Sequence, residues 1–318
     1  MIVTLTPNPS VDRTYELRQL DRGAVIRSSA TRVDPGGKGI NVARALIANG
    51  VAARAVVPLG GPEGEQLRHG VERLDPDLEV IAVPVAEATR TNISLVEPDG
   101  TTTKINAPGP RLSADEATAL TKTAVEAMGD AAWVAGSGSL PPGAPEELYA
   151  QLIEAAHAAG ARVAIDSSGS PLAASLRAHP DLIKPNADEL ATLVGWPIRT
   201  LGDVLGAVKT LRRKGARTVV ISLGADGAVL VEGSSAWHAT VRRIVPRSPV
   251  GAGDSLVAGL LAEGGEGPDA LRRGVAYGTA AAQLPGTKLP GPADLDLDGV
   301  RIQDVDPTRP LLEPGGIH

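Results

Sequence analysis

The sequence predicts an α/β fold built on a mainly parallel β-sheet, with a second, smaller β-sheet attached to it. Three observations support this prediction. From residue 113 onward, short apolar strands alternate with helical patterns, as in right-handed β-α-β units. The segments at about 13–34 and 88–108 instead have alternating or hairpin-like apolar spacing. No repeat and no linker interrupts the 318 residues, so we expect one domain over 1–318.

The composition limits the classes of function open to the chain. Aromatic residues make up only 2% and Phe is absent, so stacking on nucleic-acid bases is not expected. The formal net charge of -6 argues against a nucleic-acid or membrane-surface binder, because its field repels both partners. With no Cys and scattered His, neither a disulfide nor a zinc site is expected. The N-terminus lacks a signal-segment pattern, which predicts a cytoplasmic protein.

Local patterns predict the elements of the first half. A β-branched strand at 2–6 ends at Pro7-Asn8-Pro9, because proline cannot continue a strand ladder. A hairpin over 89–106 turns at Glu97-Pro98-Asp99-Gly100, which contains a strong turn signal. The other elements expected here are helices at 40–47 and around 63–74 and strands at 56–59 and 80–83.

In the second half, the strands end repeatedly in small or polar residues. Ser113 and Glu116 match a capping box at the start of a helix over 113–128. The expected strands are 133–135, 163–165, 182–183 and 219–221, and further helices are expected from 254 and over 270–284. Because the carboxyl ends of parallel strands meet at one edge, that edge is where we expect ligands. Charge and Pro/Gly content rise after 291, and we expect 311–318 to be a mobile tail.

The segment from Ser248 to Gly259 carries the strongest chemical signal. Gly-Ala-Gly at 251–253 has little side-chain bulk and leads into a helix, so an anion can approach the exposed N–H groups of the helix start. Asp254 follows in the first turn. A carboxylate beside such a turn suits phosphoryl transfer, because it can accept the proton of an attacking hydroxyl. Taken alone, the segment is equally an ordinary tight turn with an Asp that caps the helix.

A second glycine-rich helix start surrounds Lys38 and continues to Asn41. Its spacing matches neither a Walker A loop nor a Rossmann Gly-x-Gly-x-x-Gly, which argues against a nicotinamide-dependent enzyme. Asp12 lies just past the first strand, where open α/β sheets place groups that bind ligands, and a carboxylate can accept bonds from sugar hydroxyls. A flexible loop and a turn aspartate are the alternative interpretations.

Together these segments resemble the two signatures of the PfkB (ribokinase-like) carbohydrate kinases, in the family's order and over about 1–290. Gly-Ala-Gly-Asp at 251–254 is similar to the second signature and Gly-Gly-Lys-Gly at 36–39 to the first. The resemblance implies a ribokinase-like three-layer αβα sandwich with a mainly parallel sheet and a small β-sheet lid, formed by the segments 13–34 and 88–108. Lids of this kind often pair, so a homodimer is expected. Pro249 stands where relatives usually have Thr, which removes a donor beside the nucleotide.

The resemblance also implies roles for individual residues. Asp254 would be the general base, with Gly251, Ala252 and Gly253 stabilising the transferred group. The implied sugar-phosphate residues are Asp12, Gly37, Lys38, Gly39, Asn41, Arg90, Lys104, Ser137 and Ser139. The implied nucleotide residues are Lys184, Asn186, Ser222, Leu223, Gly224, Ala225, Asp226, Gly227, Val250, Gly253 and Gly286. Lys38 and Arg90 would hold the phosphate already on the sugar, and Asn186 with Glu189 would organise Mg²⁺ through water.

The activity that this resemblance implies is ATP- and Mg²⁺-dependent phosphorylation of the C6 hydroxyl of D-fructose 1-phosphate. The run from Thr6 to Asp12 and the lysine in the first glycine-rich loop indicate this branch of the family. Kinases of tagatose 6-phosphate or fructose 6-phosphate stay open as alternatives. A non-catalytic sugar-phosphate sensor that uses the same pocket is a further alternative from another functional class.

Overall fold

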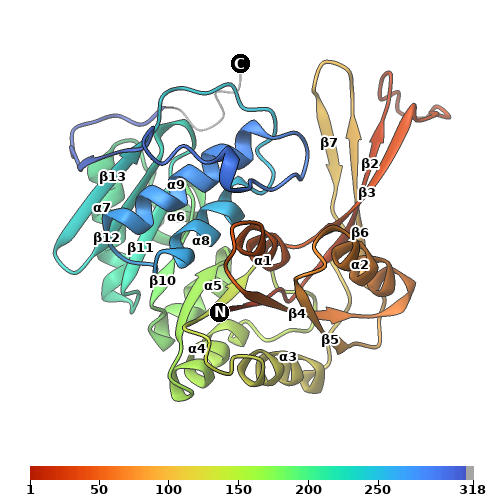
Figure 1. The fold of residues 1–318 in the computed structure, drawn as a ribbon, viewed down its shortest axis with the longest axis horizontal. Helices are drawn as coiled ribbons and strands as arrows, with labels where there is room; N and C mark the ends of the chain where they lie inside the picture. The colour runs from red at the N-terminus through yellow and green to blue at the C-terminus, as the bar shows by residue number, and fades with distance from the viewer. Residues whose placement is uncertain (313–318) are drawn as a thin grey trace.

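The structure, a computed structural model, describes residues 1–312 and contains a large and a small β-sheet (Figure 1). In the described residues the large sheet has ten strands in the order β14-β13-β12-β11-β10-β9-β8-β1-β4-β5. They are β1 (Ile2–Leu5), β4 (Ala53–Leu59), β5 (Glu79–Pro84), β8 (Trp133–Ser137), β9 (Arg162–Asp166), β10 (Leu182–Ile183), β11 (Thr218–Ser222), β12 (Ala228–Glu232), β13 (Ser235–Thr240) and β14 (Arg301–Asp304). The seven neighbouring strands β11-β10-β9-β8-β1-β4-β5 are parallel, whereas β12, β13 and β14 pair antiparallel. The mainly parallel sheet is therefore confirmed.

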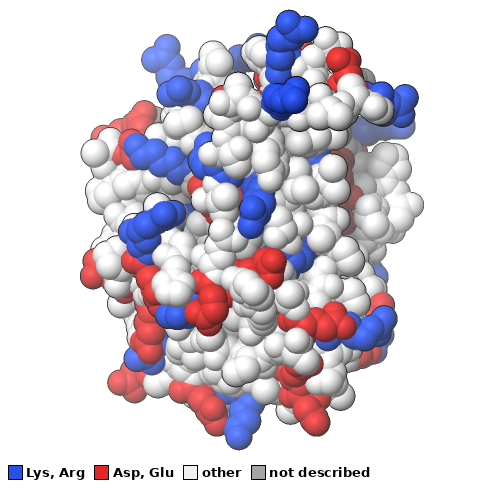
Figure 2. All heavy atoms as spheres, turned by 90° about the vertical axis from the view of Figure 1, so that its right-hand side faces the viewer, with Lys and Arg blue, Asp and Glu red and all other residues white. Residues whose placement is uncertain are grey.

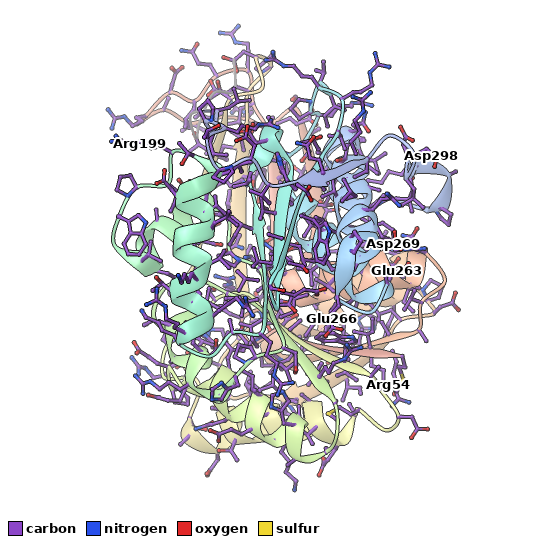
Figure 3. All side chains as sticks on the ribbon, turned by 90° about the vertical axis from the view of Figure 1, so that its left-hand side faces the viewer. Arg54, Arg199, Glu263, Glu266, Asp269 and Asp298 are labelled. Atoms are coloured by element: carbon purple, nitrogen blue, oxygen red, sulfur yellow. The ribbon has the colours of Figure 1, made fainter. Side chains whose placement is uncertain are left out.

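Helices cover both faces of the large sheet, and Figure 3 shows the three layers from the side. One layer contains α1 (Lys38–Ala48), α2 (Gly61–Leu74), α8 (Ala252–Ala262) and α9 (Gly267–Gln283). The other contains α3 (Ala114–Glu126), α4 (Leu148–Ala158), α5 (Gly169–Ser175), α6 (Ala187–Val194) and α7 (Leu201–Arg213). Successive strand residues point to opposite faces, so Val3 and Leu5 pack in one core while Ile2 packs in the other. The αβα sandwich follows from these two apolar cores.

The small sheet has the strand order β3-β2-β6-β7. Its strands are β2 (Ser10–Glu16), β3 (Ala30–Gly36), β6 (Arg90–Val96) and β7 (Thr102–Ile105), with β2 and β6 parallel and the other pairs antiparallel. Because Ser10 pairs directly with Gly36, the first segment of this sheet is longer than the predicted 13–34. The second segment falls within the predicted 88–108. The expected small β-sheet is thus present.

Local sequence patterns predict the helix that begins after Ser113 but miss the strand after residue 291. The capping box is confirmed, because the Ser113 hydroxyl accepts from the Glu116 N–H at 3.2 Å and the Glu116 carboxylate accepts from the Ser113 N–H at 2.7 Å. No strand was expected after residue 291, yet β14 pairs with β13 and extends the large sheet by one strand.

In the described residues, no helix has both the length and the apolar character needed to cross a membrane. The cytoplasmic location stays a prediction.

The tail predicted over 311–318 begins with two anchored residues. The Leu311 N–H donates to the Arg199 carbonyl at 2.8 Å, and the Leu312 N–H donates to the Asp226 carboxylate at 2.7 Å. The rest of the predicted tail, 313–318, lies outside the described residues.

Candidate active site

The two glycine-rich helix starts meet at the carboxyl edge of the large sheet. Asn41 of α1 donates from Nδ2 to Oδ2 of Asp254 in α8 at 2.8 Å, although the two residues are 213 positions apart. Helices α1 and α8 pack against each other in the same layer, which brings their amino-terminal ends together. The convergence expected from the sequence is therefore present.

The turn before α8 offers unpaired backbone donors. Gly251 has φ +79°, a left-handed conformation that glycine adopts without strain, and no side chain caps the helix. Within residues 1–312, the N–H groups of Gly253 and Asp254 have no hydrogen-bond partner. A Cβ added to Gly253 would lie 3.5 Å from Nζ of Lys184, so a lysine ammonium borders the turn. Free N–H groups beside a cation form an anion site of the kind that binds phosphates.

Asp254 is buried and its proton affinity is unusual. Burial, together with the nearby Asp166 carboxylate, raises the pKa of Asp254 from 3.8 to about 6, and the Asn41 bond and two lysines oppose this rise. The carboxyl is thus largely ionised at neutral pH but keeps a proton affinity well above that of an exposed aspartate. A general base needs this combination.

Asp166 holds two lysines together beside Asp254. Its Oδ1 accepts from Lys38 Nζ at 3.3 Å and from Lys184 Nζ at 3.2 Å, and its Oδ2 is buried with no partner in the described residues. Burial alone would lower the pKa of Lys38, but the neighbouring carboxylates, Asp166 first, raise it. Lys38 therefore lies near Asp166 and Asp254. Its expected role, in which it shares the phosphate on the sugar with Arg90, stays a prediction.

Asp12 is held by polar neighbours on the small sheet. Its Oδ1 accepts from the Ser10 hydroxyl at 2.7 Å and from Asn92 Nδ2 at 3.0 Å. Burial raises the pKa of Asp12 in spite of these bonds. Gly36 lies against the same carboxylate, because an added Cβ would be 2.4 Å from Asp12 Oδ2. The carboxylate is thus fixed in place and can accept bonds from a hydroxylated ligand.

The two cations of the β6–β7 hairpin have different surroundings. Arg90 donates to the carbonyls of Asn8 and Ala107, at 2.9 Å each, and its Nε is buried without a partner in the described residues. Its guanidinium is therefore held in a fixed position by backbone. Lys104 is exposed on β7 opposite Ser94, and it reaches none of the other predicted site residues.

The end of β8 contributes hydroxyl groups. The Ser137 hydroxyl is buried and has no partner among the described residues, so it is available to a ligand. Ser139 is exposed and lies 3.5 Å from Asn8 Nδ2. Gly37 and Gly39 serve close packing, because an added Cβ on either residue would come within 2.8 Å of the Thr6 side chain.

The predicted nucleotide turn divides into an open part and a structural part. Gly224 has φ +59° with open space where a Cβ would be, so a ligand can approach the backbone there. At Gly227 a Cβ would lie 1.9 Å from the Ala239 carbonyl oxygen, so this glycine serves the packing of the β12–β13 hairpin. The buried Asp226 carboxylate accepts from Arg309 at 3.1 Å and anchors the C-terminal segment. Its side chain is thus already engaged within the protein.

Asn186 and Glu189 form a helix cap that leaves part of each side chain free. The Asn186 Oδ1 accepts from the Glu189 N–H at 2.8 Å, and the Glu189 carboxylate accepts from the Asn186 N–H at 2.9 Å. The charge of Glu189 also acts on Lys38, so it faces the site. In the described residues no three His, Cys, Asp or Glu side chains form a metal-binding group. This sparse set suits Mg²⁺, which keeps several waters and binds largely through substrate phosphates.

Two residues near the site had not been singled out from the sequence. Asp166 was visible only as the end of a strand, and the pairing of β8 with β9 brings it beside Lys38. Arg32 of the small sheet pairs with Asp34 at 2.6 Å, and its guanidinium lies against Gly286, one of the implied nucleotide residues. Only the fold connects these positions.

Charge on the side of the small sheet is unevenly distributed. In Figure 2, Lys and Arg gather mainly in the upper half of this face, where the tips of the small-sheet hairpins lie, and Asp and Glu gather mainly in the lower half. A protein of net charge -6 thus presents local positive charge beside the lid.

Comparison with known proteins agrees with this geometry. The pfkB family carbohydrate kinases match residues 5–294, so the chain belongs to this family. It is 38% identical to 1-phosphofructokinase of Rhodobacter capsulatus over 92% of this chain and 94% of that protein. It is also 38% identical to ATP-dependent 6-phosphofructokinase isozyme 2 of Escherichia coli K12, over 91% of this chain and 94% of that protein. Sugar-phosphate kinases of two specificities are therefore equally similar.

Solved structures show the same fold. Escherichia coli phosphofructokinase-2 in complex with substrates and products has a TM-score of 0.84 and 37% identity, covering 92% of this chain and 96% of that one. A tetrameric inhibited form of that enzyme has a TM-score of 0.80 and 36% identity, covering 89% of this chain and 92% of that one. Arabidopsis thaliana ribokinase has a TM-score of 0.71 and 22% identity, covering 94% of this chain and 96% of that one. This likeness shows that the fold is ribokinase-like. The chain is a kinase with the fold of this family.

Proposed function

We propose that this kinase transfers the γ-phosphoryl group of MgATP to the C6 hydroxyl of D-fructose 1-phosphate, giving fructose 1,6-bisphosphate. The hydrogen bond between Asn41 and Asp254 carries the proposal, because it joins the two glycine-rich segments around one buried carboxylate. The relatives support a sugar-phosphate acceptor. The lysine in the first glycine-rich loop favours fructose 1-phosphate over fructose 6-phosphate.

Each step of the reaction has a residue suited to it. Asp254, ionised at neutral pH, accepts the proton of the C6 hydroxyl as the oxygen attacks. The free N–H groups of Gly253 and Asp254 stabilise the charge that spreads over the moving phosphoryl group, together with Lys38 and Lys184. Glu189 and Asn186 would help to hold Mg²⁺, which would supply positive charge beside the phosphoryl oxygens.

The acceptor is oriented from the small sheet. Asp12 accepts hydrogen bonds from sugar hydroxyls, and Asn41 and Ser137 add further polar contacts. Arg90, whose guanidinium is fixed by two backbone carbonyls, binds the phosphate on C1 with the Nη hydrogens that these carbonyls leave free. Lys104 would complete that phosphate site only if the hairpin moves, because it is exposed in this structure.

On the nucleotide side, ATP binds against the open backbone at Gly224. Further contacts to ATP come from Ser222, Leu223, Ala225, Val250 and Gly286. Pro249 supplies no N–H here, so the backbone donors of the α8 turn carry more of the phosphate binding.

We also propose a homodimer that forms through the small sheet. β7 is an edge strand of this sheet whose residues are all exposed, including Ile105 at 55%, so it offers an unpaired strand edge to a second copy.

An ADP-release assay tests the acceptor. Fructose 1-phosphate, fructose 6-phosphate and tagatose 6-phosphate are compared at fixed MgATP, and the value of kcat/KM is expected to be highest for fructose 1-phosphate. A clear preference for either 6-phosphate would reassign the chain to the second specificity among its relatives. No release with any of the three would contradict the kinase proposal and leave a sugar-phosphate sensor.

A further inference from the structure

A second charged hollow lies at the opposite end of the large sheet from Asp254. It opens at Thr218, where β11 begins, whereas the nucleotide turn follows the other end of that strand. The hollow has a volume of about 530 Å³, and its charged lining consists of His179, Arg212, Arg213, Arg217, Glu232 and Glu266. An adjoining hollow of about 570 Å³ shares Arg212 and Arg213 and adds Lys209. We call the two together the arginine pocket.

The cations of the arginine pocket form no ion pairs with the carboxylates that line it. Glu266 pairs with Arg162 at 3.4 Å, and the Glu232 carboxylate accepts from the Gly267 N–H at 3.1 Å, so both acids have partners outside the pocket cations. Arg217 pairs with Asp181 at 3.0 Å. Among residues 1–312, no carboxylate lies within ion-pair distance of Lys209, Arg212 or Arg213. Three cations therefore share this pocket without an ion-pair partner in the described residues.

Arg212 is held in position by backbone groups of other segments. Its Nε donates to the Arg217 carbonyl at 3.2 Å and its Nη1 donates to the Gly233 carbonyl. The first carbonyl precedes β11 and the second lies in the β12–β13 turn. These bonds fix the guanidinium plane before any ligand arrives, which lowers the entropy cost of binding, and they leave Nη2 free.

Basic residues are common in the last turn of a helix, where they complement the helix dipole. Arg213 fits that explanation, because its Nε donates to the Lys209 carbonyl of the same helix at 3.3 Å. Arg212 does not, since its bonds leave α7 for two other segments. Figure 3 looks onto this side, with Glu266 beside the lower ends of the strands and Arg199, which precedes α7, at the upper end.

We propose that the arginine pocket binds a small, multiply charged phosphate compound at a site separate from the active site. Guanidinium groups match phosphate oxygens in geometry and charge, and two neighbouring arginines suit an anion with more than one charge. The volume is in the range of small-molecule sites, about 300–1,000 Å³. Binding at this pocket does not depend on which sugar the kinase phosphorylates.

Calorimetric titration with inorganic pyrophosphate tests this proposal. The wild-type protein should show two classes of site, one at the α8 turn and one at the arginine pocket. Arg212→Gln combined with Arg213→Gln should weaken one class at least tenfold and leave the other unchanged. Arg18→Gln combined with Arg301→Gln removes the same charge from two exposed positions elsewhere, so it should bind like the wild type.

Two results would overturn the proposal: pyrophosphate binding by the Arg212/Arg213 variant equal to that of the wild type, or an equal loss in the Arg18/Arg301 control. Because Arg212 also bonds to backbone, its loss could unfold the region. Arg213→Gln alone avoids this, since in the described residues the Arg213 side chain hydrogen-bonds only within its own helix, and it should still weaken the same class of site severalfold. Unchanged binding in this single variant, with the thermal midpoint also unchanged, would count against the pocket.

Discussion

Replacing Asn41 by alanine should shift the acid side of the pH–kcat/KM profile to higher pH. The Asn41 amide donates to the Asp254 carboxylate at 2.8 Å, and this bond lowers the pKa of a carboxyl that burial raises to about 6. Only the ionised carboxylate can accept a proton from the sugar hydroxyl, so the wild-type rate should fall as the pH drops below about 6.

The size of the shift follows from the bond. A hydrogen bond to a charged group contributes about 1.5–3 kcal/mol, and about 1.4 kcal/mol corresponds to a tenfold change in proton affinity. Losing the bond should therefore move the acid limb up by about one to two pH units. At about pH 7 the ionised fraction would fall from about nine tenths to between about one half and one tenth. This change alone would lower kcat/KM by about two- to tenfold, and this part of the loss would be recovered near pH 9.

The assay is steady-state ADP release from about pH 5 to 9 at substrate concentrations well below KM, which gives kcat/KM. Asn92→Ala is the matched control, because its amide makes the same kind of bond to Asp12, at 3.0 Å, and Asp12 is not the base. This control should raise KM for the sugar and leave the acid limb in place. An acid limb that stays near pH 6 in Asn41→Ala, or that moves equally in both variants, would refute the reasoning.

Three further predictions concern the lysine cluster, the cost of the buried base and the hairpin glycine. Lys38→Met should lower kcat by about 10²-fold with a smaller change in KM for the sugar, measured by initial rates; a change in KM alone would return Lys38 to the far-end phosphate. Asp254→Asn should stabilise the ligand-free protein in urea by up to about 3 kcal/mol at about pH 8 and not at about pH 4. The sign follows because a carboxyl whose folded pKa is raised from 3.8 to about 6 penalises the folded state only as pH rises through that interval, so equal stabilities at both pH values would be contrary. Gly227→Ala should destabilise the fold by at least about 2 kcal/mol more than Gly224→Ala, because only its Cβ meets a backbone carbonyl, at 1.9 Å, and equal urea midpoints would rule this out.

Local patterns were sufficient for most of the scaffold. The strand that precedes Pro7, the capping box at Ser113 and the helix that contains Asp254 all depend on residues close in sequence. The order of β-α-β units then places the strand ends at one edge, so the meeting of Asn41 with Asp254 could be expected from topology.

Other features depend on partners that are distant in sequence. The segment 301–304 is polar and short, and it is a strand only because the exposed edge of β13 offers it hydrogen bonds. Asp226 looked like a ligand residue, but Arg309 and Leu312 occupy its carboxylate. The pairing of Lys38 with Asp166 could not be expected, because nothing in the loop of Lys38 indicates that residue.

The central claim, that Asp254 is the base of a sugar-phosphate kinase, is tested most directly by the turnover of Asp254→Asn. The substitution keeps the shape and the neighbours of the side chain but removes its ability to accept a proton. We predict a loss of about 10²–10⁴-fold in kcat, with the dissociation constants of nucleotide and sugar phosphate nearly unchanged. A variant that turns over within about threefold of the wild type would contradict the account.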